Sequence, residues 1–121
     1  MKQIVQKVEK PWGHETRWAI NDKYLGKILH IKRNRRLSTQ YHEIKDETIF
    51  VLRGVLIVHV GLKSNKQPES TFILKQGESF RIEPKVIHRF CAPADGFVEL
   101  VEVSTPEIND VVRLQDDYDR T

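Results

Sequence analysis

Three residues with metal-binding side chains lie within eight positions of each other in the stretch "LSTQYHEIKDETIFVLRG", residues 37–54. Gln40 and His42 are two apart, so on a strand both would point to the same face. Glu47 follows across a short loop, just ahead of an apolar run that ends at Gly54. An imidazole, a carboxylate and an amide oxygen are ligands for a divalent cation, so the segment is either a polar turn or part of a metal site.

Short strands are the elements that would position these residues. Runs rich in Val, Ile, Leu and Phe alternate with Gly, Pro, Asn and Asp, which predicts an all-β sandwich or barrel. Only residues 109–118, "NDVVRLQDDY", show a weak helical pattern. The expected strands are 15–20, 24–32, 47–53, 55–61, 70–75, 79–82, 88–92 and 98–104.

Two of these strands, "TIFVL" and "VLIVHV", are apolar on both faces. A strand with one solvent-exposed face would alternate apolar and polar residues, so both faces of these strands should be covered. One face would line a barrel interior, and the other would pack on a second sheet or on another subunit. The pattern therefore favours a homodimer.

Length and composition indicate one domain over residues 1–121, with 39% hydrophobic and 31% charged residues. Cys91 is the single cysteine, which excludes an internal disulfide framework and fits a reducing compartment. The N-terminus has no signal-peptide pattern, and no apolar stretch is long enough to cross a bilayer. We therefore expect a cytoplasmic protein with no membrane partner.

The net charge of +3 is concentrated in "HIKRNRR", residues 30–36. This run is either a solvated loop or a phosphate-binding edge. Nucleic-acid binding is disfavoured, because no recognition module or interleaved aromatic residues accompany it.

The spacing Q-x-H-x4-E-x6-G, from Gln40 to Gly54, resembles the first metal motif of the cupin family, with Gln in place of the usual first His. The second cupin motif begins at a Gly and places its His eleven residues later. "GESFRIEPKVIHR" matches it with Gly77 and His88. The motifs span residues 34–54 and 77–92, and the resemblance implies a metal held by Gln40, His42, Glu47 and His88. Such a donor set suits zinc first, with manganese, iron or cobalt as alternatives.

The resemblance covers nearly the whole chain, from "VEKPWGHE" to "VEVSTPEINDVVRLQDDYDR". The chain is similar to the single-cupin module of type II phosphomannose isomerases and to their small stand-alone relatives. This implies a jelly-roll barrel, a divalent metal, and the interconversion of mannose 6-phosphate and fructose 6-phosphate through an enediolate.

Several residues depart from the pattern of that family. Asn34, Lys85 and Asp119 stand where Gly is usual, and Glu83 replaces a Pro in the turn before His88. Asn tolerates a positive φ better than most residues, so the first of these turns can survive. Glu43 and Ile44 occupy positions that often carry further histidines.

An aldose–ketose isomerase needs a general base and cations for the phosphate, besides an electrophile. Glu102 and His59 interrupt apolar strands and would enter the barrel if they point inward. Trp12 is either a sugar contact or, more commonly, a core or interface anchor. The candidate catalytic residues are Lys32, Glu102 and His59, and the candidate phosphate ligands are Lys32 and Arg36, then Arg89 and Lys27.

Two further functions remain open at this point. One is a non-catalytic sugar-binding or regulatory cupin. The other is a metal enzyme of another class, such as an epimerase or a dioxygenase. The Gln at the first ligand position argues against a dioxygenase, because those enzymes generally use more histidines.

Overall fold

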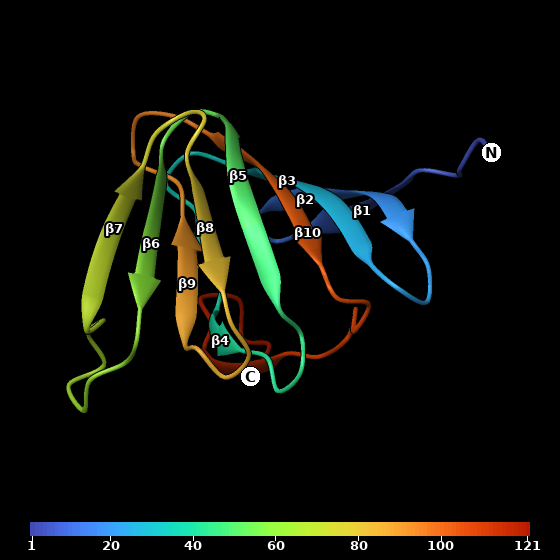
Figure 1. Cartoon of the computed structure of the whole chain (residues 1–121). Coiled ribbons are helices and arrows are strands. Elements are labelled where there is room, and N and C mark those ends of the chain that lie inside the picture. The colour runs from blue at the N-terminus through green and yellow to red at the C-terminus, as the bar shows by residue number, and fades with distance from the viewer.

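The computed structural model describes residues 1–121 and consists of strands, turns and loops only, which confirms the all-β prediction (Figure 1). It contains no helix of the length and hydrophobicity needed to cross a membrane. The eleven strands are β1 Gln6–Lys10, β2 Gly13–Ile20, β3 Leu25–Ile31, β4 Thr39–Tyr41, β5 Glu47–Arg53, β6 Leu56–Val60, β7 Ser70–Leu74, β8 Ser79–Ile82, β9 His88–Cys91, β10 Val98–Ser104 and β11 Val112–Gln115.

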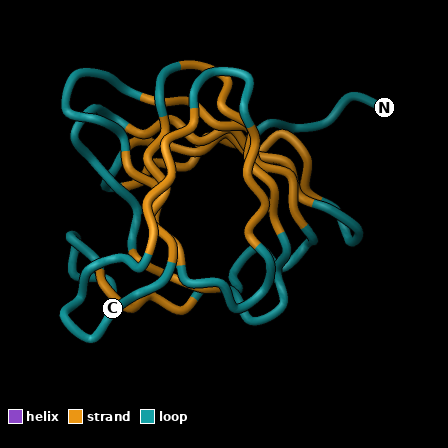
Figure 2. Tube along the Cα trace, turned by 60° about the vertical axis from the view of Figure 1, so that its left-hand side comes forward, coloured by secondary structure: helices purple, strands orange, loops and turns teal.

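Two antiparallel sheets form the walls of a jelly-roll barrel. One has six strands in the order β1-β2-β3-β10-β5-β8, and the other has five in the order β11-β4-β9-β6-β7. Viewed along its axis, the barrel shows the strands of both sheets surrounding the middle of the molecule (Figure 2). Side chains of one parity along each strand therefore point inward.

Each of the eight strands expected from the sequence corresponds to a strand of the structure. The expectation missed β1, β4 and β11. The weak helical pattern at 109–118 was wrong, because Val112–Gln115 instead pair with β4 as an antiparallel strand. A register shift between Arg113 and Gln115 breaks the alternation there, which explains why no strand period is visible in the sequence.

The inward face changes character along the barrel. On β10, Val98 and Leu100 are fully buried, whereas Glu102 and Ser104 follow at the other end of the strand. On β5 the order is reversed, with Glu47 first and then Ile49 and Val51, and the antiparallel register places Glu47 opposite Ser104. One half of the barrel is thus an apolar core, and the other half is a polar chamber held in place by it.

The outward face of β5 and β10 is apolar but uncovered within one chain. Phe50, Leu52 and Val103 remain 43%, 38% and 49% exposed. The sequence predicted that both faces of β5 are buried. Within the single chain only the inner face is buried. The homodimer stays a prediction.

Three positions where the family usually has Gly keep a left-handed backbone without it. Asn34, Lys85 and Asp119 have φ values of 60°, 71° and 61°. Residues other than Gly are strained in this left-handed region, and Asn is strained least. All three turns therefore have a left-handed residue, and in the turn before His88 this conformation is strained because the residue is Lys85.

Candidate metal centre and barrel cavity

His42, Glu47 and His88 meet at the polar end of the barrel, although 46 residues separate the two histidines. Their potential ligand atoms all lie within 4.8 Å of one another, and all three residues are buried. Glu47 Oε1 lies 3.6 Å from His42 Nε2 and 3.4 Å from His88 Nε2. The spacing motifs therefore bring three side chains to one point.

Both imidazoles are oriented by the backbone. His42 Nδ1 donates to the carbonyl of Asp110, and His88 Nδ1 donates to the carbonyl of Val86 at 2.9 Å. With the proton on Nδ1, each Nε2 carries a lone pair. Both Nε2 atoms are buried and have no hydrogen-bond partner, which costs free energy unless a cation occupies the space between them. These orphaned atoms show that the residues fit a divalent metal.

Asp110 also fixes the loop between β4 and β5. Its carboxylate accepts hydrogen bonds from the backbone N–H groups of Glu43, Ile44 and Lys45, at 3.0, 2.8 and 2.9 Å. Burial raises the pKa of Asp110, but these three donors outweigh it and hold the pKa below its ordinary value. Asp110, in the loop between β10 and β11, thereby positions both the His42 ring and the loop that leads to Glu47.

Two buried carboxylates share one ammonium group. Lys45 Nζ lies 3.1 Å from Glu47 Oε2 and 2.9 Å from Glu102 Oε2. Burial alone would lower the pKa of Lys45, yet the two glutamates raise it above its ordinary value. Burial and the charge of Glu47 raise the pKa of Glu102. His42 and His88 in their protonated forms, together with Lys45, outweigh burial and keep the pKa of Glu47 well below its usual range. The two carboxylates are thus electrostatically distinct.

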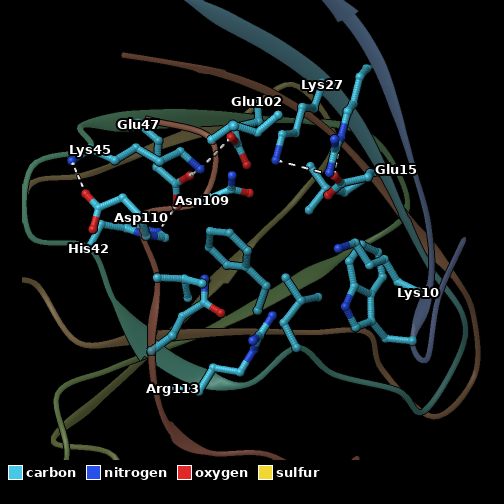
Figure 3. A pocket seen from close by; sticks show the side chains of 18 of the residues that line it. Lys10, Glu15, Lys27, His42, Lys45, Glu47, Glu102, Asn109, Asp110 and Arg113 are labelled. Atoms are coloured by element: carbon cyan, nitrogen blue, oxygen red, sulfur yellow. Dashed lines mark hydrogen bonds and ion pairs between the residues drawn. The ribbon is translucent and has the colours of Figure 1, made fainter. Parts of the chain in front are cut away.

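A cavity of about 330 Å³ opens from this cluster (Figure 3). Six cationic and four anionic side chains line it, together with Trp12, Leu29, Leu37 and Phe90. A polar, positively charged chamber with one apolar wall suits a small, polar, anionic ligand. The charged residues are Lys10, Arg17, Lys27, Lys45, Arg113, Arg120, Glu15, Glu47, Glu102 and Asp110.

Two of the six cations have no ion-pair partner. Arg17 and Lys27 both form ion pairs with Glu15, at 2.8 and 3.5 Å. Lys45 is paired with Glu47 and Glu102, as described above. Arg120 is paired with Asp116. Lys10 and Arg113 form none of these ion pairs, and Arg113 Nε is buried without a hydrogen-bond acceptor.

Burial lowers the pKa of both unpaired groups, and the charge of nearby Arg120 lowers both further. Lys10 and Arg113 therefore bring unpaired positive charge to the wall of the cavity.

Gln40, the fourth expected ligand, lines the cavity and pairs with His88 across β4 and β9. Its side-chain oxygen accepts a hydrogen bond from Ser38 Oγ at 2.6 Å. An amide oxygen has a second lone pair, so this bond leaves one for a cation.

The structure brings Glu102, Lys27 and Trp12 to the barrel cavity. Trp12 is 3% exposed and belongs to the core cluster, so it is both an anchor and part of the cavity wall.

The remaining candidates lie elsewhere. Lys32 follows β3 and is exposed. His59, Arg36 and Arg89 line a second cavity, on the outside of the five-stranded sheet. His59 faces outward because the inward positions of β6 are Leu56 and Val58, which are fully buried.

Four residues of the site were missed from the sequence: Lys10, Lys45, Asp110 and Arg113. Lys45 could have been noticed as a charge two residues before Glu47, and Asp110 as a charge in the loop after the strand that ends at Ser104. Arg113 gave a weaker signal, a single cation within "VVRLQ". Lys10 had none, because β1 is mostly exposed and polar.

The family model for the C-terminal domain of mannose-6-phosphate isomerase matches residues 1–116. The chain belongs to this family. Among its curated relatives, the xanthan biosynthesis protein XanB of Xanthomonas campestris pv. campestris is 29% identical over 119 residues. The alginate biosynthesis protein AlgA of Pseudomonas aeruginosa is 28% identical over 117 residues. These alignments cover 96% and 94% of this chain, but it spans only about a quarter of each relative, 24% and 23%.

Solved structures confirm the cupin fold of this family member. The capsular polysaccharide assembling protein CapF of Staphylococcus aureus superposes with a TM-score of 0.77 at 14% identity, over 93% of this chain and 34% of CapF. An RmlC-like cupin from Shewanella frigidimarina superposes with a TM-score of 0.71 at 15% identity, over 87% and 86% of the two chains. At such identities these likenesses concern the fold alone.

Proposed function

We propose that this protein is a metal-dependent sugar-phosphate isomerase that interconverts mannose 6-phosphate and fructose 6-phosphate. The observation that carries the proposal is the barrel cavity. His42, with an orphaned imidazole nitrogen, and Glu47 line one end of it beside His88, and two unpaired cations lie elsewhere in its wall. The match of nearly the whole chain to the mannose-6-phosphate isomerase family supports the choice of sugar.

His42, Glu47 and His88, with Gln40 beside them, are the residues that would hold the metal. Zinc suits this donor set, and manganese, iron and cobalt are compatible with it. When bound, such an ion polarises a carbonyl oxygen and stabilises negative charge that develops on it.

Glu102 is our candidate for the general base. It is buried, lines the cavity, and projects from β10 beside Lys45. In the aldose-to-ketose direction its carboxylate would take the proton from C2 of the open-chain sugar, giving an enediol(ate), and return a proton to C1. The Lys45 ammonium, 2.9 Å away, holds the carboxylate in place and stabilises its charged form.

Arg113 and Lys10 are our candidates for the phosphate. Both line the cavity and neither is in an ion pair, so they can offer a dianion charge-assisted hydrogen bonds that no protein carboxylate already uses. Of the four phosphate candidates expected from the sequence, only Lys27 lines the barrel cavity, where it forms an ion pair with Glu15.

A coupled assay on the metal-loaded protein tests this proposal. Glu102→Gln should lower kcat by at least about a hundredfold, as general-base removal does, and keep the metal content of the wild type. Arg113→Gln should mainly raise KM for the phosphate ester. Arg53→Gln, on the outer face of β5, is the matched control with unchanged kinetics. Stoichiometric metal with no turnover of either sugar phosphate would reject the isomerase and favour a non-catalytic sugar-binding cupin.

We also propose that the protein is a cytoplasmic homodimer, with the exposed face of β5 and β10 as the contact. Phe50, Leu52 and Val103 form an apolar surface there, the kind of surface that subunit contacts bury. Sedimentation equilibrium should give a dimer mass that Phe50→Lys converts to a monomer mass. A monomer mass for the wild type at micromolar concentration would contradict the dimer.

A further inference from the structure

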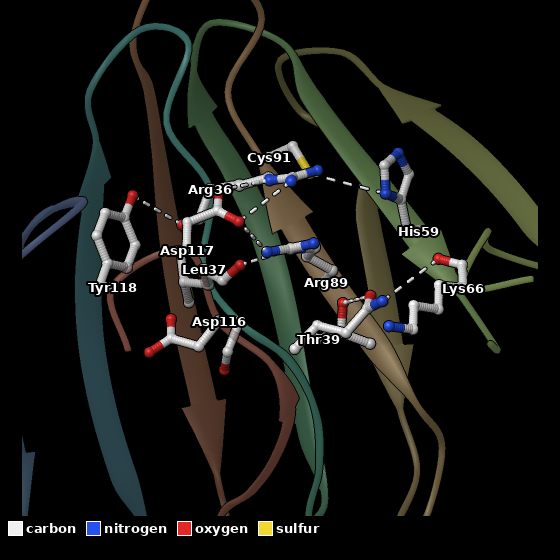
Figure 4. A network of polar contacts seen from close by, with 12 residues as sticks. Arg36, Leu37, Thr39, His59, Lys66, Arg89, Cys91, Asp116, Asp117 and Tyr118 are labelled. Atoms are coloured by element: carbon white, nitrogen blue, oxygen red, sulfur yellow. Dashed lines mark hydrogen bonds and ion pairs between the residues drawn. The ribbon is translucent and has the colours of Figure 1, made fainter. Parts of the chain in front are cut away.

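The second cavity, of about 360 Å³, lies on the outer face of the five-stranded sheet and is lined by only one hydrophobic residue. Arg36 precedes β4, Arg89 is on β9, His59 is on β6 and Lys66 belongs to the loop between β6 and β7 (Figure 4). None of these residues reaches the barrel cavity, so the two cavities are separate.

One carboxylate holds both guanidinium groups. Arg36 Nε and Nη2 donate to Asp117 at 2.7 and 3.1 Å, and Arg89 Nη2 donates to the same carboxylate at 3.0 Å. Arg89 Nε donates to the carbonyl of Leu37 at 2.7 Å, and the side chain of Arg89 is only 6% exposed. The two guanidinium groups are therefore fixed in place before any ligand binds.

The charges of this cluster do not balance. Asp117 is a single negative charge between two positive ones, Lys66 adds a third at the rim, and Asp116 is already bound to Arg120. The hydrogen bonds above leave the Nη1 groups of Arg36 and Arg89 with unused donors. Burial lowers the pKa of Arg89 and of His59, and Arg36 lowers both further, as expected for an electropositive pocket.

We propose that this outer cavity binds a phosphate group, either inorganic phosphate or the phosphate of a small phosphomonoester. Preorganised guanidinium groups suit tetrahedral oxyanions, and the polar lining suits a hydrated ligand rather than an apolar one. The phosphate lies against the free Nη1 groups and Lys66, beside the Asp117 carboxylate, which weakens binding by repulsion. This site does not depend on the isomerase activity or on the metal.

Amide NMR shifts during titration with inorganic phosphate test the site at fixed ionic strength. We expect saturable shifts at His59, Lys66 and Arg89 of the wild type. Arg36→Gln and Lys66→Gln should each raise the dissociation constant about fivefold or more, and Asp117→Asn should lower it. Arg53 is paired with Glu99 on the six-stranded sheet, so Arg53→Gln should change nothing, and Arg113→Gln, in the barrel, should leave these shifts intact.

Parallel titrations with mannose 6-phosphate and mannose distinguish the sources of the phosphate. Similar affinity for inorganic phosphate and the ester means that the phosphate group alone is recognised, and tighter binding of the ester means that the sugar also contributes. Equal shifts with free mannose would overturn the proposal. So would the absence of localised shifts, or an effect of Arg53→Gln as large as that of Arg36→Gln, which would mean diffuse ionic attraction.

Discussion

The two cavities are similar in volume, about 330 and 360 Å³, and lie on opposite faces of the five-stranded sheet. They differ in how far their polar and charged side chains are paired within the protein. In the barrel, buried polar atoms of His42, His88 and Arg113 have no partner. Outside, each arginine already donates to Asp117. The buried polar atoms of the barrel cavity lack hydrogen-bond partners, which a ligand could supply. The arginines of the outer pocket already have partners in the protein, so that pocket is stable without a ligand.

A single segment of chain serves both cavities. Asp110 and Arg113 face the barrel, and Gln115, Asp116 and Asp117 line the outer pocket. The irregular pairing between Arg113 and Gln115 turns the chain from one face to the other, since regular alternation would put both side chains on the same side. The C-terminal segment thus contributes a bracing aspartate to each site.

Loss of a histidine should break the barrel site and leave the outer one intact. His42→Ala and His88→Ala should each weaken metal binding by at least about a hundredfold, because two ligands cannot replace three or four. The apolar half of the barrel should keep both variants folded. Elemental analysis after dialysis measures the metal, and circular dichroism measures the fold.

His14→Ala is the matched control for these variants, because His14 stacks on His30 away from the cluster and should retain metal. Stoichiometric metal in both His42→Ala and His88→Ala would contradict the site.

Asp110→Ala should loosen the barrel site without removing a ligand. Three backbone N–H groups lose their acceptor, at about 1 kcal/mol each when water replaces it only in part. We expect a loss of about 3 kcal/mol in the free energy of unfolding and about tenfold weaker metal binding. Urea titration and competition with a chelator measure the two effects. If stability falls with no change in metal affinity, Asp110 braces the loop without orienting His42.

Asp116→Asn tests the C-terminal segment through pH. The hydrogen bond from Arg120 lowers the pKa of Asp116, outweighing its burial, so the charged carboxylate stabilises the folded state above the unfolded pKa of about 4. This stabilisation is lost as pH falls through the lower pKa of the folded state. The variant should be less stable than the wild type by about 1 kcal/mol at pH 7, and the difference should vanish near pH 2. A difference that is constant between pH 7 and pH 2 would exclude the charge as its cause.

Lys85→Gly should give the smallest change and a stabilising one. Lys85 has a φ of 71°, which Gly adopts without strain, and its N–H donates to the carbonyl of His42 at 2.6 Å in either variant. We expect a gain of about 0.5–1 kcal/mol by urea titration. Asn34→Gly is the control and should gain less, because Asn tolerates this conformation. An equal gain at both positions would mean that side-chain type does not set the strain.

The sequence predicted the strands and the metal cluster well because both depend on short-range patterns. Short apolar runs separated by turn residues identify the strands, and the cupin spacings bring His42, Glu47 and His88 together once the fold is known. β11 was missed because its pairing with β4 is irregular, so no alternation marks it.

The proposed phosphate-binding residues were harder to predict, because the basic run suggested charges without showing which carboxylates neutralise them. Arg36 is held by Asp117, 81 residues away, whereas Arg113 stays unpaired at the edge of the barrel. Both outcomes depend on how distant segments meet, and no local pattern records that. The same holds for His59, whose direction follows from the packing of Leu56 and Val58.

The most direct test of the account is ¹H and ³¹P NMR of mannose 6-phosphate incubated in D₂O with the zinc-loaded protein. Proton abstraction by Glu102 predicts that fructose 6-phosphate accumulates to equilibrium, and that Glu102→Gln with the same zinc content forms none. Unchanged mannose 6-phosphate in the presence of one bound zinc per chain would contradict the isomerase.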